Sequence, residues 1–136
     1  LVKPCLRRRP GEGVGDALRI HASVPGSVDG NAPSTLTFYA GSLTGRQAHL
    51  RLPSAPECEA GCRVELSVDD AAIEVVRATK LRDSENTLAL RGARDIWRSL
   101  ENANVLQIAF KDASGAERTA IFKVTGMDSD AMTGWK

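Results

Sequence analysis

Few side chains in this sequence suggest acid–base or metal chemistry. The only two histidines, His21 and His49, each fall on the more polar face of an expected strand. A site shared with Cys5 or a carboxylate would form only if those two strands pair. Zinc needs three or four converging ligands, and no local spacing supplies them. We therefore expect no metal and no cofactor, and we interpret His21 and His49 as surface histidines that are secondary candidates for binding a partner.

The adjacent carboxylates Asp69 and Asp70 have the residue types of a glycosidase acid and base, with Glu65 and Glu74 nearby. Neighbouring residues of a strand point to opposite faces, so this pair cannot share a pocket, and a hairpin turn is the favoured interpretation. The chain also has no G-x-S-x-G nucleophile elbow. We predict that the protein is not an enzyme, and no residue is assigned as catalytic.

Cys58 and Cys62 enclose only three residues, one of which is Gly61. A loop of this length can bring two Cα atoms to about 5.5 Å, the usual disulfide spacing, when glycine relaxes the backbone. We predict a Cys58–Cys62 disulfide, which would indicate the periplasm or the cell exterior. The alternative is a pair of free thiols at a strand edge. Cys5 remains as an odd cysteine.

Length, composition and charge exclude several classes of protein. With 136 residues, 42% of them hydrophobic, the chain has the size of one domain. Its net charge is +1, from 18 basic and 17 acidic residues, which disfavours nucleic acid as a partner. No run of about 18 apolar residues occurs, so we expect no membrane-spanning segment. We expect a flexible arm over residues 1–16, a β-rich domain over 17–127 and a tail over 128–136.

These residues must be positioned mainly by strands, because apolar and polar residues alternate along most of the chain. Strands are expected over residues 17–24, 35–40, 47–52, 63–68, 87–90, 106–111 and 119–124. Residues 71–79 are ambiguous, and their β-branched side chains favour a strand. Pro25 and Gly26 are expected to end the first strand. Residues 28–34 and 80–85 are expected to be connections.

One segment has helical spacing instead. Apolar residues recur at i, i+3, i+4 and i+7: Ala93, Ile96, Trp97 and Leu100. This spacing predicts one short amphipathic helix over about residues 93–103. Arg94 and Arg98 lie on its outer face, which is first a solvated face and second a candidate surface for an acidic partner. The predicted fold is mainly β, an antiparallel sandwich or partly open barrel of about seven or eight strands with a single helix.

A cysteine loop ending in Gly61 and Cys62, a helix with Trp97, and a hairpin that turns at Gly115 and closes on Gly126 and Met127 occur here in that order. This half of the chain resembles the invasion-associated locus B family of bacterial periplasmic proteins. The family's N-terminal aromatic and cysteine pattern is absent, and the segment between Cys62 and the helix is longer here. The resemblance implies an exported β-sandwich-like domain and supplies no catalytic residues.

These observations predict a non-enzymatic, periplasmic or secreted β-domain. It would bind a protein partner through an exposed sheet edge or loop. The alternative is a small-ligand or metal-binding periplasmic domain, which would show a concave pocket lined by His21 or His49. The partner and the oligomeric state are not predicted.

Overall fold

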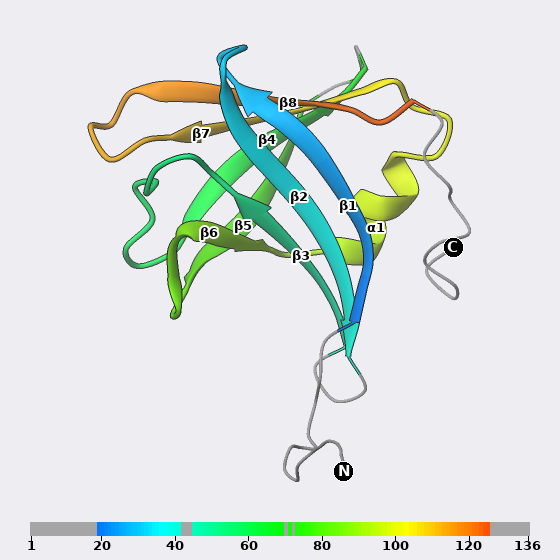
Figure 1. Ribbon diagram of the computed structural model, residues 1–136, viewed down its shortest axis with the longest axis horizontal. Coiled ribbons are helices and arrows are strands. Elements are labelled where there is room, and N and C mark those ends of the chain that lie inside the picture. Colours follow the sequence, from blue (N-terminus) through cyan, green and yellow to red (C-terminus); the bar gives the residue numbers. More distant parts are fainter. Residues whose placement is uncertain (1–18, 42–44, 70, 72, 126–136) are drawn as a thin grey trace, which may run out of the picture.

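The alternating segments form eight antiparallel strands that close into a barrel, with one short helix (Figure 1). In chain order the elements are β1 (Arg19–Val28), β2 (Ala32–Gly41), β3 (Gly45–Arg51), β4 (Cys62–Val68), β5 (Glu74–Leu81), β6 (Ser84–Leu90), α1 (Ala93–Ser99), β7 (Val105–Lys111) and β8 (Glu117–Lys123). The computed structural model describes residues 19–41, 45–69, 71 and 73–125. The mainly β prediction with one helix is confirmed, and the barrel is closed. The predicted arm over residues 1–16, the tail over 128–136, and Gly126 and Met127 lie outside the described residues.

Two meanders of three strands, β1-β2-β3 and β4-β5-β6, and the hairpin β7-β8 build the barrel. The order around it is β1-β2-β3-β6-β5-β4-β7-β8, and β8 returns to β1. Because β3 pairs with β6 and not with β4, residues 52–61 must cross from one meander to the other. Helix α1 lies in the second crossing connection, between β6 and β7. Figure 1 shows the first crossing at the left-hand end of the barrel and α1 at the right-hand end.

Inward-facing side chains fill the barrel, as is usual for eight strands. Seven large ones have no exposed surface: Leu36, Phe38, Leu50, Leu88, Leu106, Ile108 and Phe122. The apolar stripe predicted for the helix is buried, and the Trp97 ring meets the Phe38 ring edge to face, with centroids 5.0 Å apart. Helix α1 therefore closes one end of the barrel with apolar side chains.

The first strand does not end at Pro25 and Gly26, and that prediction is wrong. Strand β1 continues through both residues to Val28, and only residues 29–31 of the expected connection over 28–34 lie between β1 and β2. Strand β8 pairs with β1 over residues 26–28 only, so the edge of β1 at Pro25 has no partner strand among the described residues. A proline, which lacks an N–H, is tolerated at such an edge.

Two other predicted boundaries are also wrong. Helix α1 ends at Ser99 and not at residue 103, because the chain turns at Asn102, which has a φ of 63°. Asparagine tolerates this left-handed conformation. The expected connection over residues 80–85 is only Arg82 and Asp83, because Leu81 and Ser84 already pair as strand residues. Charged residues occur on the exposed faces of hairpin strands as readily as in loops. The charges of residues 80–85 therefore did not show where the turn between β5 and β6 begins and ends.

We predict that Gly26→Ala will destabilise the protein, because this position lies where the barrel closes. A Cβ at Gly26 would lie 2.5 Å from the carbonyl oxygen of Ile121 and 2.5 Å from Cδ1 of Phe122. We expect the free energy of unfolding to fall by about 2 kcal/mol, as for other overpacked sites. Urea denaturation measures this change.

Ser27→Ala is the matched control, since it changes the next residue without adding a Cβ, and it should cost under about 0.5 kcal/mol. A Gly26→Ala variant as stable as this control would mean that β1 and β8 do not approach closely in solution.

Candidate functional site

The connection over residues 52–61 is held across one end of the barrel. The Leu52 N–H donates to the Asn86 carbonyl at 2.8 Å, and the Glu57 N–H donates to the Lys111 carbonyl at 3.0 Å. Leu52 and Cys58 turn inward and are each 2% exposed. Backbone hydrogen bonds to β6 and β7 together with two buried side chains fix this connection, which differs in this respect from an ordinary surface loop.

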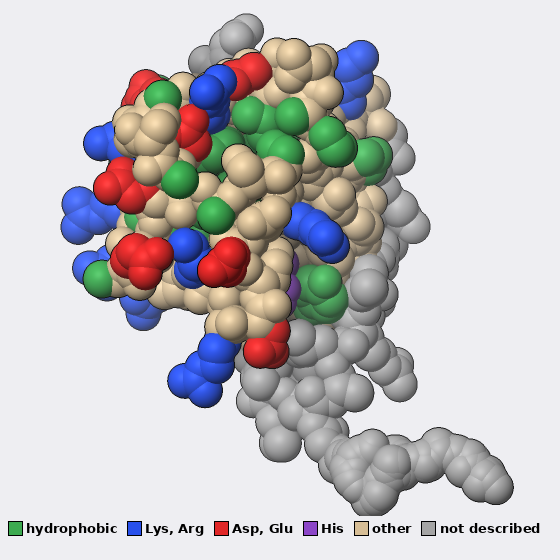
Figure 2. All heavy atoms as spheres, turned by 60° about the vertical axis from the view of Figure 1, so that its left-hand side comes forward, with side chains coloured by type: hydrophobic (Ala, Val, Ile, Leu, Met, Phe, Trp, Pro, Cys, Tyr) green, Lys and Arg blue, Asp and Glu red, His purple; other side chains and the backbone are tan. Residues whose placement is uncertain are grey.

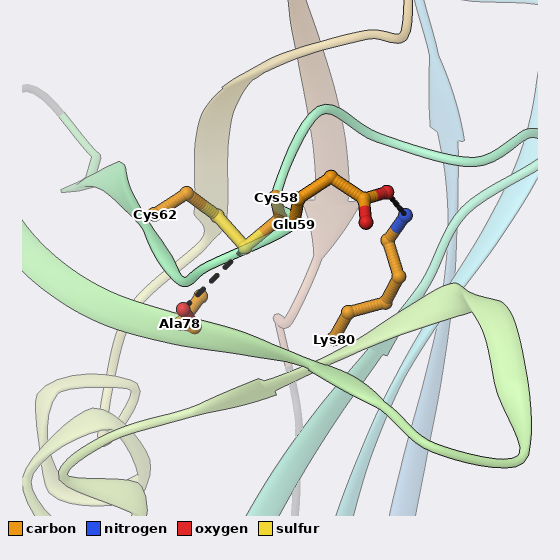
Figure 3. The surroundings of a disulfide bond; sticks show 5 residues. All are labelled: Cys58, Glu59, Cys62, Ala78 and Lys80. Atoms are coloured by element: carbon orange, nitrogen blue, oxygen red, sulfur yellow. Dashed lines mark hydrogen bonds and ion pairs between the residues drawn. A yellow bond between two sulfur atoms is a disulfide. The ribbon is translucent and has the colours of Figure 1, made fainter.

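The predicted Cys58–Cys62 disulfide is present, with Cα atoms 5.0 Å apart (Figure 3). Gly61 has a φ of 93°, a conformation that glycine adopts without strain and that closes this short loop. The Cys58 sulfur also lies 3.5 Å from the carbonyl oxygen of Ala78 on β5. A disulfide sulfur has no proton to donate, so this contact is one of packing. The disulfide ties the connection to the first residue of β4.

Figure 3 also shows Glu59 reaching across to Lys80 on β5, where Nζ lies 3.3 Å from Oε2. The Glu59 side chain is 91% exposed, so solvent screens this ion pair and it adds little stability. The connection is therefore held by its backbone, its disulfide and its buried side chains. Its exposed acidic groups remain available to a partner.

A cleft of about 500 Å³ lies between this connection and the adjoining ends of β4, β7 and β8. Its charged wall residues are Glu57, Glu59, Glu65, Glu117, Arg63 and Lys111. Among the described residues, only Glu59 of these six forms an ion pair. The cleft thus has four acidic and two basic groups, and five of these six form no close ion pair with a described residue. Figure 2 turns the left-hand side of Figure 1 toward the viewer and shows acidic and basic side chains interspersed on that face.

Asp112 begins the turn between β7 and β8 and is fully engaged in holding it. Its Oδ1 accepts hydrogen bonds from the Ser114 hydroxyl and from the N–H groups of Ser114 and Ala116. Its Oδ2 accepts from Arg118 Nε at 2.8 Å, and Arg118 also pairs with Asp29 at 2.9 Å. These bonds, the Ser114 hydroxyl first and Arg118 second, hold the pKa of Asp112 well below its usual range. Asp112 is therefore ionised and structural.

Asp69, one of the two carboxylates considered for acid–base chemistry, is also structural. It turns the chain with a φ of 54°, and its Oδ1 accepts the N–H groups of Asn104 and Val105 at 3.0 and 2.9 Å. The carboxylate thereby holds the end of β4 against the start of β7. Asp70 lies outside the described residues.

His49 lies on the outward face of β3, as predicted, but it is only 9% exposed and is not an ordinary surface histidine. Its Nε2–H donates to Oε1 of Gln47 at 2.8 Å, and the Tyr39 ring lies 4.7 Å away, centroid to centroid. Burial lowers the pKa of His49. A pocket of about 300 Å³ opens beside it, and its walls are Thr35, Thr37, Tyr39, His49, Arg51, Leu81, Ser84 and Thr87. We call these eight residues the hydroxyl pocket.

Of the other predicted partner-binding residues, the two whose side chains are described are not part of these two features. Arg94 and Arg98 are exposed on α1, and neither lines the cleft or the hydroxyl pocket. The backbone of His21 belongs to β1, but its side chain is outside the description, as is all of Cys5. In the described part of the chain, no three His, Cys, Asp or Glu side chains are grouped so that they could hold a metal ion. No helix there has the length and apolar character needed to cross a membrane.

Sequence reasoning singled out His49, Cys58 and Cys62 but missed most of the other residues that line the two features. Glu57 and Glu117 are 60 positions apart and line one cleft only because the crossing connection is fixed beside β7. Arg51 and Thr87 come together only because β3 pairs with β6. The one available signal was weak, since the outward positions of β2 and β3 are polar throughout, which is ordinary for half-exposed strands.

We predict that removing the disulfide will loosen the cleft without unfolding the barrel. A ring of five residues constrains the unfolded chain little, so Cys58→Ala with Cys62→Ala should cost about 2 kcal/mol or less. Amide hydrogen exchange should accelerate at residues 57–61 and stay unchanged in β1 and β2. Exchange that accelerates throughout the barrel would show that the disulfide supports the whole fold.

We predict that the protein loses stability as the pH falls through the range of histidine titration. The unfolded chain protonates His49 near its ordinary pKa of 6.5, whereas the folded state resists protonation because burial lowers that pKa. Stability should therefore be full above about pH 7 and should decline from there towards pH 5.5. Urea midpoints across this range test the trend, and His49→Asn should show a flatter profile than the wild type. Parallel profiles would mean that His49 is not buried.

The chain was compared with protein-family models, with curated proteins and with solved structures, and it matches none of them. The resemblance to the invasion-associated locus B family, carried by Cys58, Cys62 and Trp97 among others, therefore stays a prediction.

Proposed function

We propose that this protein is a non-catalytic binding domain of the periplasm or the cell exterior, and that it binds the basic segment of a protein partner. The binding surface would be the cleft beside the Cys58–Cys62 loop. The observation that carries this proposal is a fixed connection whose acidic side chains remain exposed around a cleft of about 500 Å³.

The disulfide supports the proposed location. Disulfides persist in oxidising compartments and are rare in the reducing cytosol. Cys62 is partly exposed, so a reducing environment would reach the bond. The resemblance to a family of periplasmic proteins implies the same location.

A fixed loop suits binding because ordering it costs nothing at the moment of association. Recognition residues are commonly on loops that a rigid scaffold positions. Here Glu57 lies on the connection, Glu65 on β4 and Glu117 on β8, so three separate segments converge on the cleft. A partner that neutralises them gains complementary charge and a faster encounter.

The sign of these charges selects the partner. Glutamates at the cleft repel the phosphates of nucleic acids, and the net charge of +1 gives no compensating attraction. Lysine or arginine side chains of a peptide would instead pair with the carboxylates of Glu57, Glu65 and Glu117, which form no close ion pair with a described residue. A peptide backbone could also reach the cleft, because the adjoining residues Ala60 and Gly61 are small and exposed.

A peptide-binding experiment tests the proposal. Fluorescent ten-residue peptides of three kinds, lysine-rich, glutamate-rich and uncharged, would be titrated with the oxidised protein. We expect the lysine-rich peptide to bind most tightly. Glu57→Lys with Glu117→Lys should weaken that binding by roughly tenfold or more, since each reversal replaces attraction by repulsion.

Glu85→Lys with Glu101→Lys is the matched control, because it makes the same change of net charge at exposed residues that do not line the cleft. This control should lose much less affinity than the cleft variant. If both variants lost the same affinity, the peptide would be attracted by the net charge of the protein and not by a site at the cleft. If the three peptides bound with the same affinity, the proposal that the partner is basic would be wrong.

A further inference from the structure

The hydroxyl pocket is a second feature with binding chemistry, and it shares no residue with the cleft. It lies on the outward faces of β2, β3 and β6, where barrel side chains normally meet solvent. Thr37, His49 and Thr87 are nevertheless only 8 to 9% exposed. Polar groups on an outer surface are seldom this enclosed unless neighbouring strands form a concave wall around them.

Every polar side chain that lines this pocket can donate a hydrogen bond, and none is a carboxylate. Arg51 is its one permanently charged group. The Arg51 guanidinium makes no ion pair or hydrogen bond with any described side chain. An arginine beside a wall of hydroxyls, without a carboxylate to neutralise it, is electrostatically suited to an anion.

The hydrogen bonds within the pocket leave donors free. Ser84 and Thr87 hydroxyls are 2.7 Å apart, and Thr37 bonds to Ser23 at 3.1 Å. Each such pair has two hydroxyl protons and uses one of them, so one proton in each pair remains to be donated. The Thr35 hydroxyl makes no hydrogen bond with a described residue.

We propose that the hydroxyl pocket binds a small molecule through a carboxylate or phosphate group. Arg51 would take the anionic oxygens, since its planar guanidinium matches both groups bidentately. The hydroxyls of Thr35 and of the Ser84 and Thr87 pair would supply the remaining donors. The Tyr39 ring and Leu81 provide apolar wall for the rest of the ligand. A volume of about 300 Å³ suits a small ligand and no macromolecule.

Thermal unfolding with defined probes tests this site. The melting temperature would be measured in sodium phosphate, in sodium acetate and in glucose, with sodium chloride holding the ionic strength constant. A native-state ligand raises the melting temperature, by about 4 °C when its concentration is tenfold above Kd. We expect phosphate or acetate to give this rise and glucose to give none. Phosphate alone or acetate alone would identify which oxyanion the pocket selects.

Arg51→Gln should abolish the rise, whereas Arg91→Gln should keep it, because Arg91 is exposed on the chain after β6 and does not line the pocket. Thr35→Val keeps the side-chain volume and removes one hydroxyl, so it should reduce the rise in melting temperature. This variant provides the test if Arg51→Gln does not fold. Equal rises in the two arginine variants would reveal a general salt effect and overturn the site. A response to glucose alone would overturn the anionic ligand. Neither result touches the cleft, whose peptide binding is measured separately.

Discussion

The closure of the barrel between β1 and β8 is the constraint on which the other features depend. Only three residue pairs form the ladder between these two strands, and Gly26 lies at its edge against the ring of the fully buried Phe122. A side chain at Gly26 would occupy the space of that ring. Without closure, β1 and β8 would both be free edges that could pair with other chains. With closure, the strands have fixed ends for the crossing connection and for α1 to cover.

The two ends of the barrel are covered in chemically different ways. Helix α1 uses apolar side chains, and Trp97 packs on Phe38 within the core. The connection over residues 52–61 buries Leu52 and Cys58 but presents glutamates outward. The end of the barrel that α1 covers contributes stability, whereas the end with the fixed acidic loop carries the cleft that we propose as a recognition surface. This asymmetry is why the proposed partner is placed at the loop.

The buried polar residues around His49 require a different explanation. Enclosing Thr37, His49 and Thr87 removes them from water, which is unfavourable unless hydrogen bonds replace the lost ones. Gln47, Ser23 and Ser84 supply such bonds. They satisfy only part of the hydrogen-bonding capacity of the pocket. These remaining donors are the observation on which the proposed anion site rests.

The sequence by itself determined the strands, the helical stripe of Ala93, Ile96 and Trp97, and the Cys58–Cys62 disulfide, because each depends on spacing within a short segment. It also placed His49 on the outward face. Only the tertiary structure decided that β3 pairs with β6, which joins Arg51 to Thr87 and encloses the histidine. The cleft likewise depends on contacts between segments far apart in sequence. Local periodicity defines which face of a strand is polar, but strand order defines which polar faces meet.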